Sequence, residues 1–147
     1  DLLVDGGWSS VDLDQLVRAQ LDPFLHGQDH VVDVAGPPVS LGPQALQLIG
    51  MALHELATNS TKYGVMSDGN GHISCHWSHT EKGGLHFHWA ETGITVDPSL
   101  KKTTGFGSKV LSVLAPAMVN GSAETVTSEN TLTWTVTIPA AHLSSPY

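Results

Sequence analysis

Two runs of alternating apolar and polar residues in the middle of the sequence place the tightest constraint on its fold. The runs cover residues 72–80 and 85–91, and only the segment from Glu81 to Gly84 separates them. A period of two residues is typical of a strand with one buried face, and so short a connection forces two strands into an antiparallel hairpin. One face of this hairpin is apolar and carries Ile73, Cys75, Trp77, Leu85, Phe87 and Trp89. A second layer must cover that face.

Three more strands are expected around the hairpin. One runs from about Val31 to Val34, and two closing strands flank Glu129-Asn130. The second closing strand alternates most regularly, because every other residue from Leu132 to Ile138 is apolar and the residues between them are threonines. Pro139 is placed to end it. Together with the hairpin, these segments predict a sheet of about five strands.

Helical periodicity predicts the covering layer. Apolar residues recur at three- and four-residue intervals from Ser10 to Phe24, with Ser9 or Ser10 as the candidate N-cap. A second helix is predicted from Pro43 to about Tyr63, because proline suits a first helical turn and Gly64 is placed to end the helix in a left-handed conformation.

The fold class follows from these elements. A third helix is expected after the glycines at positions 105 and 107, and the aperiodic residues 93–104 before it predict a mobile loop. The sequence therefore predicts a two-layer α/β sandwich, in which about three helices cover one face of a mixed, largely antiparallel sheet. A length of 147 residues with 40% apolar content fits one domain over residues 1–147, with its core over residues 8–139.

The charge balance excludes several classes of partner. Fourteen acidic residues against six basic ones give a net charge of −8 and leave no basic stripe for a nucleic acid backbone. No apolar run approaches the ~20 residues that span a bilayer, so no direct membrane contact is expected. The single Cys75 cannot form an intramolecular disulfide, which favours a reducing, cytoplasmic compartment. The chain begins at Asp1 without a start methionine, and we expect it to be part of a longer protein.

The second predicted helix carries an acid, an amide and a base on one side. At about 100° per residue, Glu55, Asn59 and Lys62 fall within about 60° of one another. The apolar residues gather on the opposite side, namely Leu46, Ile49, Leu53 and Ala57. A carboxylate can polarise a nucleophile, an amide oxygen can ligate Mg²⁺, and an ammonium group can neutralise phosphate oxygens. The same pattern occurs on ordinary solvated helix faces, so the spacing alone leaves both interpretations open.

Two further segments carry groups that suit a nucleotide. The segment Gly105-Phe106-Gly107-Ser108 precedes a predicted helix, where backbone amides can approach an anion, although glycines there are also common turn residues. Glu91 ends a buried strand and faces inward with Trp89, where a carboxylate needs a partner. That partner is either a structural group or the exocyclic amine of a purine, and the residue alone does not distinguish them.

The sequence holds nine histidines, and four of them fall on the polar face of the predicted hairpin. These four are His72, His76, His86 and His88. Cross-strand histidines can bind zinc, but no carboxylate or cysteine is expected on that face, so we interpret them as solvated side chains. His54 lies about 100° around the helix from Glu55 and is compatible both with packing beside the site and with a functional role.

Three motifs follow one another along the chain. They are His54-Glu55-Leu56-Ala57-Thr58-Asn59 with Lys62-Tyr63-Gly64, then Trp89-Ala90-Glu91, and then Gly105-Phe106-Gly107-Ser108. Together they resemble the HWE family of sensor histidine kinases, which is named after such a His and a Trp-x-Glu, and the resemblance covers residues 8 to about 139. The first motif is highly specific and the other two are moderately so. The resemblance implies the Bergerat nucleotide-binding fold.

The resemblance also implies a function and roles for residues of the helix. The chain would be the ATP-binding catalytic domain of a two-component sensor histidine kinase, with ATP and Mg²⁺ bound. Asn59 would coordinate Mg²⁺, and Glu55 would be the base or polarising acid. Lys62 would approach phosphate oxygens, and Tyr63 and His54 would border the nucleotide.

The remaining implied roles lie beyond the helix. Glu91 would replace the Asp that reads adenine in the wider superfamily, and Gly93 would permit close approach of the base. The segment Gly105-Phe106-Gly107-Ser108 would form the second glycine box, and the residues between Gly93 and Gly105 a short ATP lid. The family usually has a glycine and a proline where this chain has Ile94-Thr95, which predicts a different start of the lid.

The partners implied are a phosphoacceptor helical hairpin domain of the same kinase and, indirectly, a response regulator. We expect the acceptor histidine outside this chain, because the residues before Trp8 are too few to form a hairpin. Two alternatives share parts of the pattern. One is a serine kinase of the anti-sigma-factor type, and the other is a degenerate module that binds a nucleotide or a response regulator without transferring phosphate.

Overall fold

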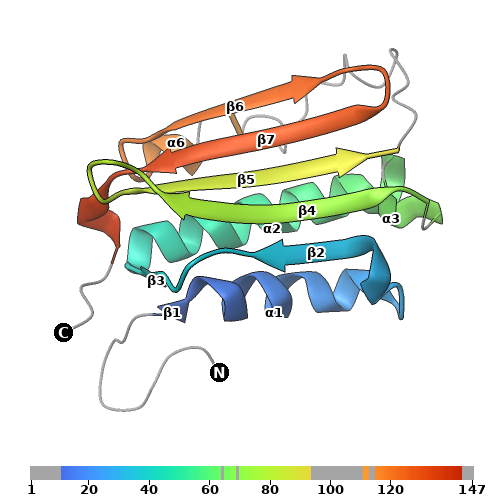
Figure 1. Cartoon of the computed structure of the whole chain (residues 1–147), viewed down its shortest axis with the longest axis horizontal. Helices are drawn as coiled ribbons and strands as arrows, with labels where there is room; N and C mark the ends of the chain where they lie inside the picture. Colours follow the sequence, from blue (N-terminus) through green and yellow to red (C-terminus); the bar gives the residue numbers. More distant parts are fainter. Residues whose placement is uncertain (1–10, 64, 69, 94–110, 113–114, 144–147) are drawn as a thin grey trace.

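A five-stranded sheet forms one layer of the protein in a computed structural model, which describes residues 11–63, 65–68, 70–93, 111–112 and 115–143. The strands lie in the order β2-β4-β5-β7-β6 (Figure 1). Their bounds are Val32–Ala35 for β2, His72–His79 for β4, Leu85–Thr92 for β5, Thr131–Ile138 for β7 and Ser122–Thr127 for β6. β2 pairs with β4 in parallel and the other neighbours are antiparallel, which confirms the predicted mixed, largely antiparallel sheet.

The hairpin of β4 and β5 has the arrangement that the alternation predicts. Cys75 lies opposite Trp89 across the two strands. In the turn, the backbone N–H of Thr80 donates to the carbonyl of Gly84 at 2.9 Å, and Gly83 has a φ of 83°, which favours glycine. The short connection therefore closes the hairpin in a register that keeps the apolar residues of both strands on one face.

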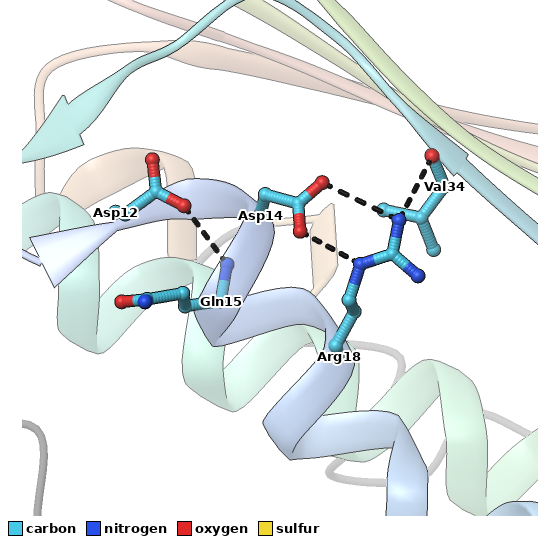
Figure 2. Close-up of polar contacts among 5 residues, drawn as sticks. All are labelled: Asp12, Asp14, Gln15, Arg18 and Val34. Atoms are coloured by element: carbon cyan, nitrogen blue, oxygen red, sulfur yellow. Dashed lines mark hydrogen bonds and ion pairs between the residues drawn. The ribbon is translucent and has the colours of Figure 1, made fainter.

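Helix α1 (Leu13–Leu25) begins later than its periodicity predicts. The residues before it form the short strand β1 (Val11–Asp12), which pairs with β3 (Ser40–Leu41). The N-cap is Asp12, whose Oδ2 accepts a hydrogen bond from the backbone N–H of Gln15 at 3.1 Å (Figure 2), so the prediction of Ser9 or Ser10 as the cap is wrong. Strand pairing of β1 keeps these residues extended and moves the start of the helix.

An exposed ion pair lies within α1, and its arginine also reaches the edge strand β2. Arg18 Nε donates to Asp14 Oδ1 at 2.7 Å, and Arg18 Nη2 donates to the backbone carbonyl of Val34 at 3.4 Å (Figure 2). Exposed pairs of this kind contribute little to stability. The hydrogen bond from Arg18 to Val34 connects the helix to the edge of the sheet.

Two long helices cover one face of the sheet. α2 (Pro43–Tyr63) has the bounds that the sequence predicts, and it runs behind β4 and β5 with α1 beside it (Figure 1). The shorter described elements are α3 (Val65–Asp68), α6 (Ala115–Ala117) and the 3-10 turns Asp29–Val31 and Ala140–His142. The prediction of about three covering helices is too high for the described residues, because most of the segment expected to form the third lies outside them. No helix within the described ranges is long and apolar enough to cross a membrane.

The core lies between the sheet and the two long helices. Trp89 and Trp134 are fully buried there and Trp77 nearly so. Phe87 stacks on Trp77 with ring centroids 6.1 Å apart. The helical layer contributes Leu53 among other apolar residues, with an exposed fraction of 0%.

The packing of α2 against the sheet is tested by truncating Leu53. We expect Leu53→Ala to lower the free energy of unfolding by about 2–5 kcal/mol, because the loss of burial is added to the cost of a cavity. Gln47→Ala, at an exposed position of the same helix, is the control and is expected to change it by less than about 0.5 kcal/mol. Urea denaturation measures both, and equal effects would contradict the described orientation of α2.

Candidate functional site

The polar residues of α2 lie at the border of its buried side. Glu55 and Asn59 are half-buried, and Lys62 is exposed. The buried side is wider than predicted, because Leu48 and Ala52 are also fully buried. At 100° per residue, Asn59 falls between those two residues on the helix. Its amide therefore emerges at the edge of the core and not from a fully solvated face.

These three polar side chains have no partner within the described part of the chain. No hydrogen bond or ion pair of Glu55, Asn59 or Lys62 is found there. Half-buried polar groups normally have a protein or water partner. Because these two have no protein partner in the described residues, the acid and the amide are available to water or to an external ligand. Within the same residues, no three His, Cys, Asp or Glu side chains are arranged to hold a metal ion. A Mg²⁺ ion bound mainly by phosphates needs only one or two protein ligands.

Glu91 lies at the end of β5 and is 2% exposed. Its Oε1 accepts hydrogen bonds from the hydroxyl of Ser60 at 2.7 Å and from the backbone N–H of Val65 at 3.1 Å. Its Oε2 accepts a hydrogen bond from the indole N–H of Trp89 at 3.2 Å. The partners that the inward carboxylate needed are thus neutral donors of the protein itself. A carboxylate has about four acceptor positions, so within the described residues one remains, and it is on Oε2.

Ser60 is a site residue that the sequence analysis missed. It is 1% exposed, and its Oγ accepts a hydrogen bond from the backbone N–H of Met66 at 3.0 Å while donating to Glu91. It falls on the same side of α2 as Ile49 and Leu53. A hydroxyl on an apolar helix face, together with an inward carboxylate elsewhere, was the signal that could have identified the pair. Ser60 follows Asn59 directly, so Glu91 meets α2 one residue from the half-buried amide.

Two glycines beside this network approach each other closely. Gly93 follows β5 with a φ of 76°, and Gly71 precedes β4 with a φ of 94°. A Cβ atom at Gly71 would lie 2.4 Å from the carbonyl oxygen of Thr92, and one at Gly93 would lie 3.0 Å from the Cα of Gly71. The chain's own backbone therefore requires glycine at position 93. Its role beside a nucleotide base stays a prediction.

The other predicted site residues lie apart from this network or outside the described residues. The ring of His54 packs edge-on against Phe24 of α1, with centroids 5.8 Å apart, on the other flank of α2 from Asn59. The ring therefore packs against α1, and not beside the site as the packing interpretation expects. The side chain of Tyr63 lies outside the described part of the structure. All of residues 94–110, which include Gly105-Phe106-Gly107-Ser108, also lie outside it.

The face of the sheet turned away from the helices carries the predicted histidines. His72, His76 and His86 are exposed there and His88 is half-buried. His76 Nε2 lies 2.8 Å from Asp33 Oδ2, so the expectation that no carboxylate shares this face is wrong. Parallel pairing of β2 with β4 brings Asp33 onto it, and this pairing is not visible in the hairpin sequence. Burial, followed by the charges of His86 and His76, lowers the pKa of His88.

Sequence comparison finds histidine kinases. No family model matches the chain. The blue-light-activated histidine kinase of Rhizobium johnstonii is 28% identical over 141 residues, which are 95% of this chain and 40% of that protein. Blue-light-activated histidine kinase 1 of Erythrobacter litoralis is 38% identical over 84 residues, which are 57% of this chain and 23% of that protein. The chain thus spans less than half the length of either relative.

Structure comparison agrees. The histidine kinase domain of a blue-light activated histidine kinase from Erythrobacter litoralis has a TM-score of 0.72 at 12% identity, covering 89% of this chain and 62% of that one. Full-length ShkA in complex with AMPPNP has a TM-score of 0.65 at 18% identity, covering 95% of this chain and 32% of that one. The two-layer sandwich is therefore the fold of these kinase domains.

Fold and sequence together place the chain in the class of histidine kinase catalytic domains. Within that class, its His54 and Trp89-Ala90-Glu91 motifs match the HWE type.

The close approach beside Glu91 is tested with two glycines. Gly71 and Gly83 both have a positive φ, but the nearest atom to a Cβ is 2.4 Å away at Gly71 and 3.8 Å away at Gly83. We expect Gly83→Ala to cost about 1 kcal/mol of unfolding free energy from backbone strain alone, and Gly71→Ala about 2–4 kcal/mol. Chemical denaturation of both variants provides the comparison. Equal losses would mean that the backbones at Gly71 and Thr92 do not meet.

Proposed function

We propose that the chain is the ATP-binding catalytic domain of a two-component sensor histidine kinase. It transfers the γ-phosphoryl group of ATP to a histidine on a separate helical dimerisation domain of the same kinase, from which a response regulator receives it. The observation that carries this proposal is the half-buried pair Glu55 and Asn59, which have no partner among the described residues. Asn59 directly precedes Ser60, whose hydroxyl donates to the buried Glu91. The names of the relatives and the AMPPNP complex of ShkA support a kinase that binds a nucleotide.

Glu91 is assigned to the binding of the nucleotide base. The remaining acceptor position on its Oε2 suits the exocyclic amine of adenine, because an ionised carboxylate accepts hydrogen bonds and cannot donate them. Gly93, two residues later, allows the base to lie against the backbone. The phosphates are assigned to Lys62 and the segment Gly105-Phe106-Gly107-Ser108, and Tyr63 borders the nucleotide. His54 is given no role in this site, because its ring packs against Phe24 on the other flank of α2.

Asn59 is assigned to Mg²⁺. A half-buried amide oxygen without a partner in the described residues is a suitable hard ligand, and Glu55 one helical turn earlier adds negative charge nearby. Mg²⁺ held there would neutralise the phosphate oxygens during transfer. The exposed ammonium group of Lys62 acts on the same oxygens from the next turn of α2.

The transfer itself needs little from the protein beyond position and charge. The ring nitrogen of the acceptor imidazole that carries a lone pair attacks the γ-phosphorus, so that an N–P bond forms, the bond to the bridging oxygen breaks and ADP leaves. Glu55 accepts a hydrogen bond from the second ring nitrogen and polarises the nucleophile. Because a neutral imidazole is already nucleophilic, catalysis consists mostly of alignment and charge neutralisation.

The roles assigned to Asn59 and Glu55 can be compared directly by substitution. We expect Asn59→Ala to weaken ATP binding in the presence of Mg²⁺ by about 10- to 100-fold, the loss of roughly 1.4–2.8 kcal/mol that follows removal of a ligand to a charged group. Glu55→Gln keeps the shape of the side chain, so it is expected to leave affinity within about threefold and to slow transfer less than Asn59→Ala does. Isothermal titration measures affinity, and transfer is followed in the full-length protein.

Gln47→Ala is the control, since this position of α2 is exposed and lies on the flank away from Asn59. Unchanged ATP affinity and transfer in Asn59→Ala would overturn the assignment. The absence of any heat with the unaltered chain at millimolar ATP would instead indicate a degenerate module. A phosphorylated product that survives acid would be a phosphoester, which would indicate a serine kinase.

A further inference from the structure

We infer that Ser60 is a positioning residue, which holds the carboxylate of Glu91 so that the site prefers a purine with an amino group at position 6 over one with a carbonyl group there. The inference rests on the proposed function, because it deepens the assignment of Glu91 to the nucleotide base. It names a side chain to which the sequence motifs assign no role.

The direction of the Ser60 hydroxyl is determined by its neighbours. The backbone N–H of Met66, 3.0 Å from Oγ, can only donate, so Oγ accepts there. The single hydroxyl proton is then free for Glu91 Oε1, 2.7 Å away, which is a normal distance for an O–H···O hydrogen bond. Both residues are almost completely buried, so water does not compete for these bonds.

The two oxygens of Glu91 are consequently held in different ways. Oε1 accepts from Ser60 and from Val65, which uses both of its acceptor positions. Among the residues that the structure describes, Oε2 accepts from Trp89 alone and keeps the remaining position. A carboxylate with this oxygen directed at the base attracts an amino group and repels a carbonyl oxygen. Selectivity therefore depends on which oxygen is occupied by the protein.

Removal of the Ser60 hydroxyl would release Oε1. The carboxylate would keep the donors at Val65 and Trp89, but a second acceptor position would become free and the group could rotate. The N–H of Met66 at the start of α3 would also lose its acceptor. A carboxylate that is free to rotate discriminates less between the two purine types, even when it still binds both.

The test compares two nucleotides that differ at position 6 of the base, ATP and inosine triphosphate. Each is titrated with Mg²⁺ into the unaltered chain, into Ser60→Ala and into Thr61→Ala. Thr61 is the matched control, because its hydroxyl on the next residue of α2 donates to the carbonyl of Thr58 at 2.7 Å and does not contact Glu91. The free energy of unfolding of each variant is measured in parallel.

We expect the unaltered chain to prefer ATP, and Ser60→Ala to narrow the ratio of the two affinities by about tenfold, the effect of one hydrogen bond to a charged group. Thr61→Ala is expected to keep the ratio. If Ser60→Ala fails to fold, Ser60→Cys replaces it, since a thiol is of similar size and a weaker donor, and the expected narrowing is smaller.

The possible outcomes separate this inference from the proposed function. If the unaltered chain prefers ATP and the Ser60 variants keep the same ratio, the inference is wrong and the proposed function stands. Equal weakening of both nucleotides together with lower stability would assign Ser60 a merely structural role and would also overturn it. Binding of both nucleotides with equal affinity by the unaltered chain removes the selectivity on which the inference depends. Binding of neither would overturn the proposed function as well.

Discussion

The buried carboxylate of Glu91 determines how the end of the sheet meets the helical layer. Burial of a charged group is costly unless polar groups replace its water. Here the replacement donors come from three elements: Trp89 in β5, Ser60 in α2 and Val65 at the start of α3. A shift of any one element would leave a buried polar group without its partner. The network therefore fixes the rotation of α2 about its own axis and its position over the sheet. It thereby also fixes the position of Asn59, the residue before Ser60.

Apolar packing and this polar network have different tasks in the structure. Burial of residues such as Trp89, Trp134 and Leu53 supplies most of the stability, but it has no preferred direction and tolerates small rotations of a helix. Hydrogen bonds are directional and select one of those rotations. In that rotation, Glu55 and Asn59 remain half-buried at the border of the core, where a ligand can reach them and where water screens them less than on an open surface.

The parts of the fold that local periodicity determines could be predicted from the sequence. The hairpin followed from alternation, and the bounds of α2 followed from a helical pattern with a proline at its start. The predictions were wrong where pairing with a segment distant in the sequence determines the structure. Pairing of Val11 with Leu41 moved the start of α1, and parallel pairing of β2 brought Asp33 beside His76. Ser60 was missed for the same reason, because its partner lies 31 residues away.

The most direct test of the account is a map of where a nucleotide binds. Backbone amide chemical shifts of the chain are recorded before and after addition of ATP and Mg²⁺. A site built on α2 and the end of β5 predicts the largest changes over residues 55–66 and 89–93, with little change on the far face of the sheet at His76 and His88. Changes confined to that far face, or no changes at saturating ATP, would contradict the account.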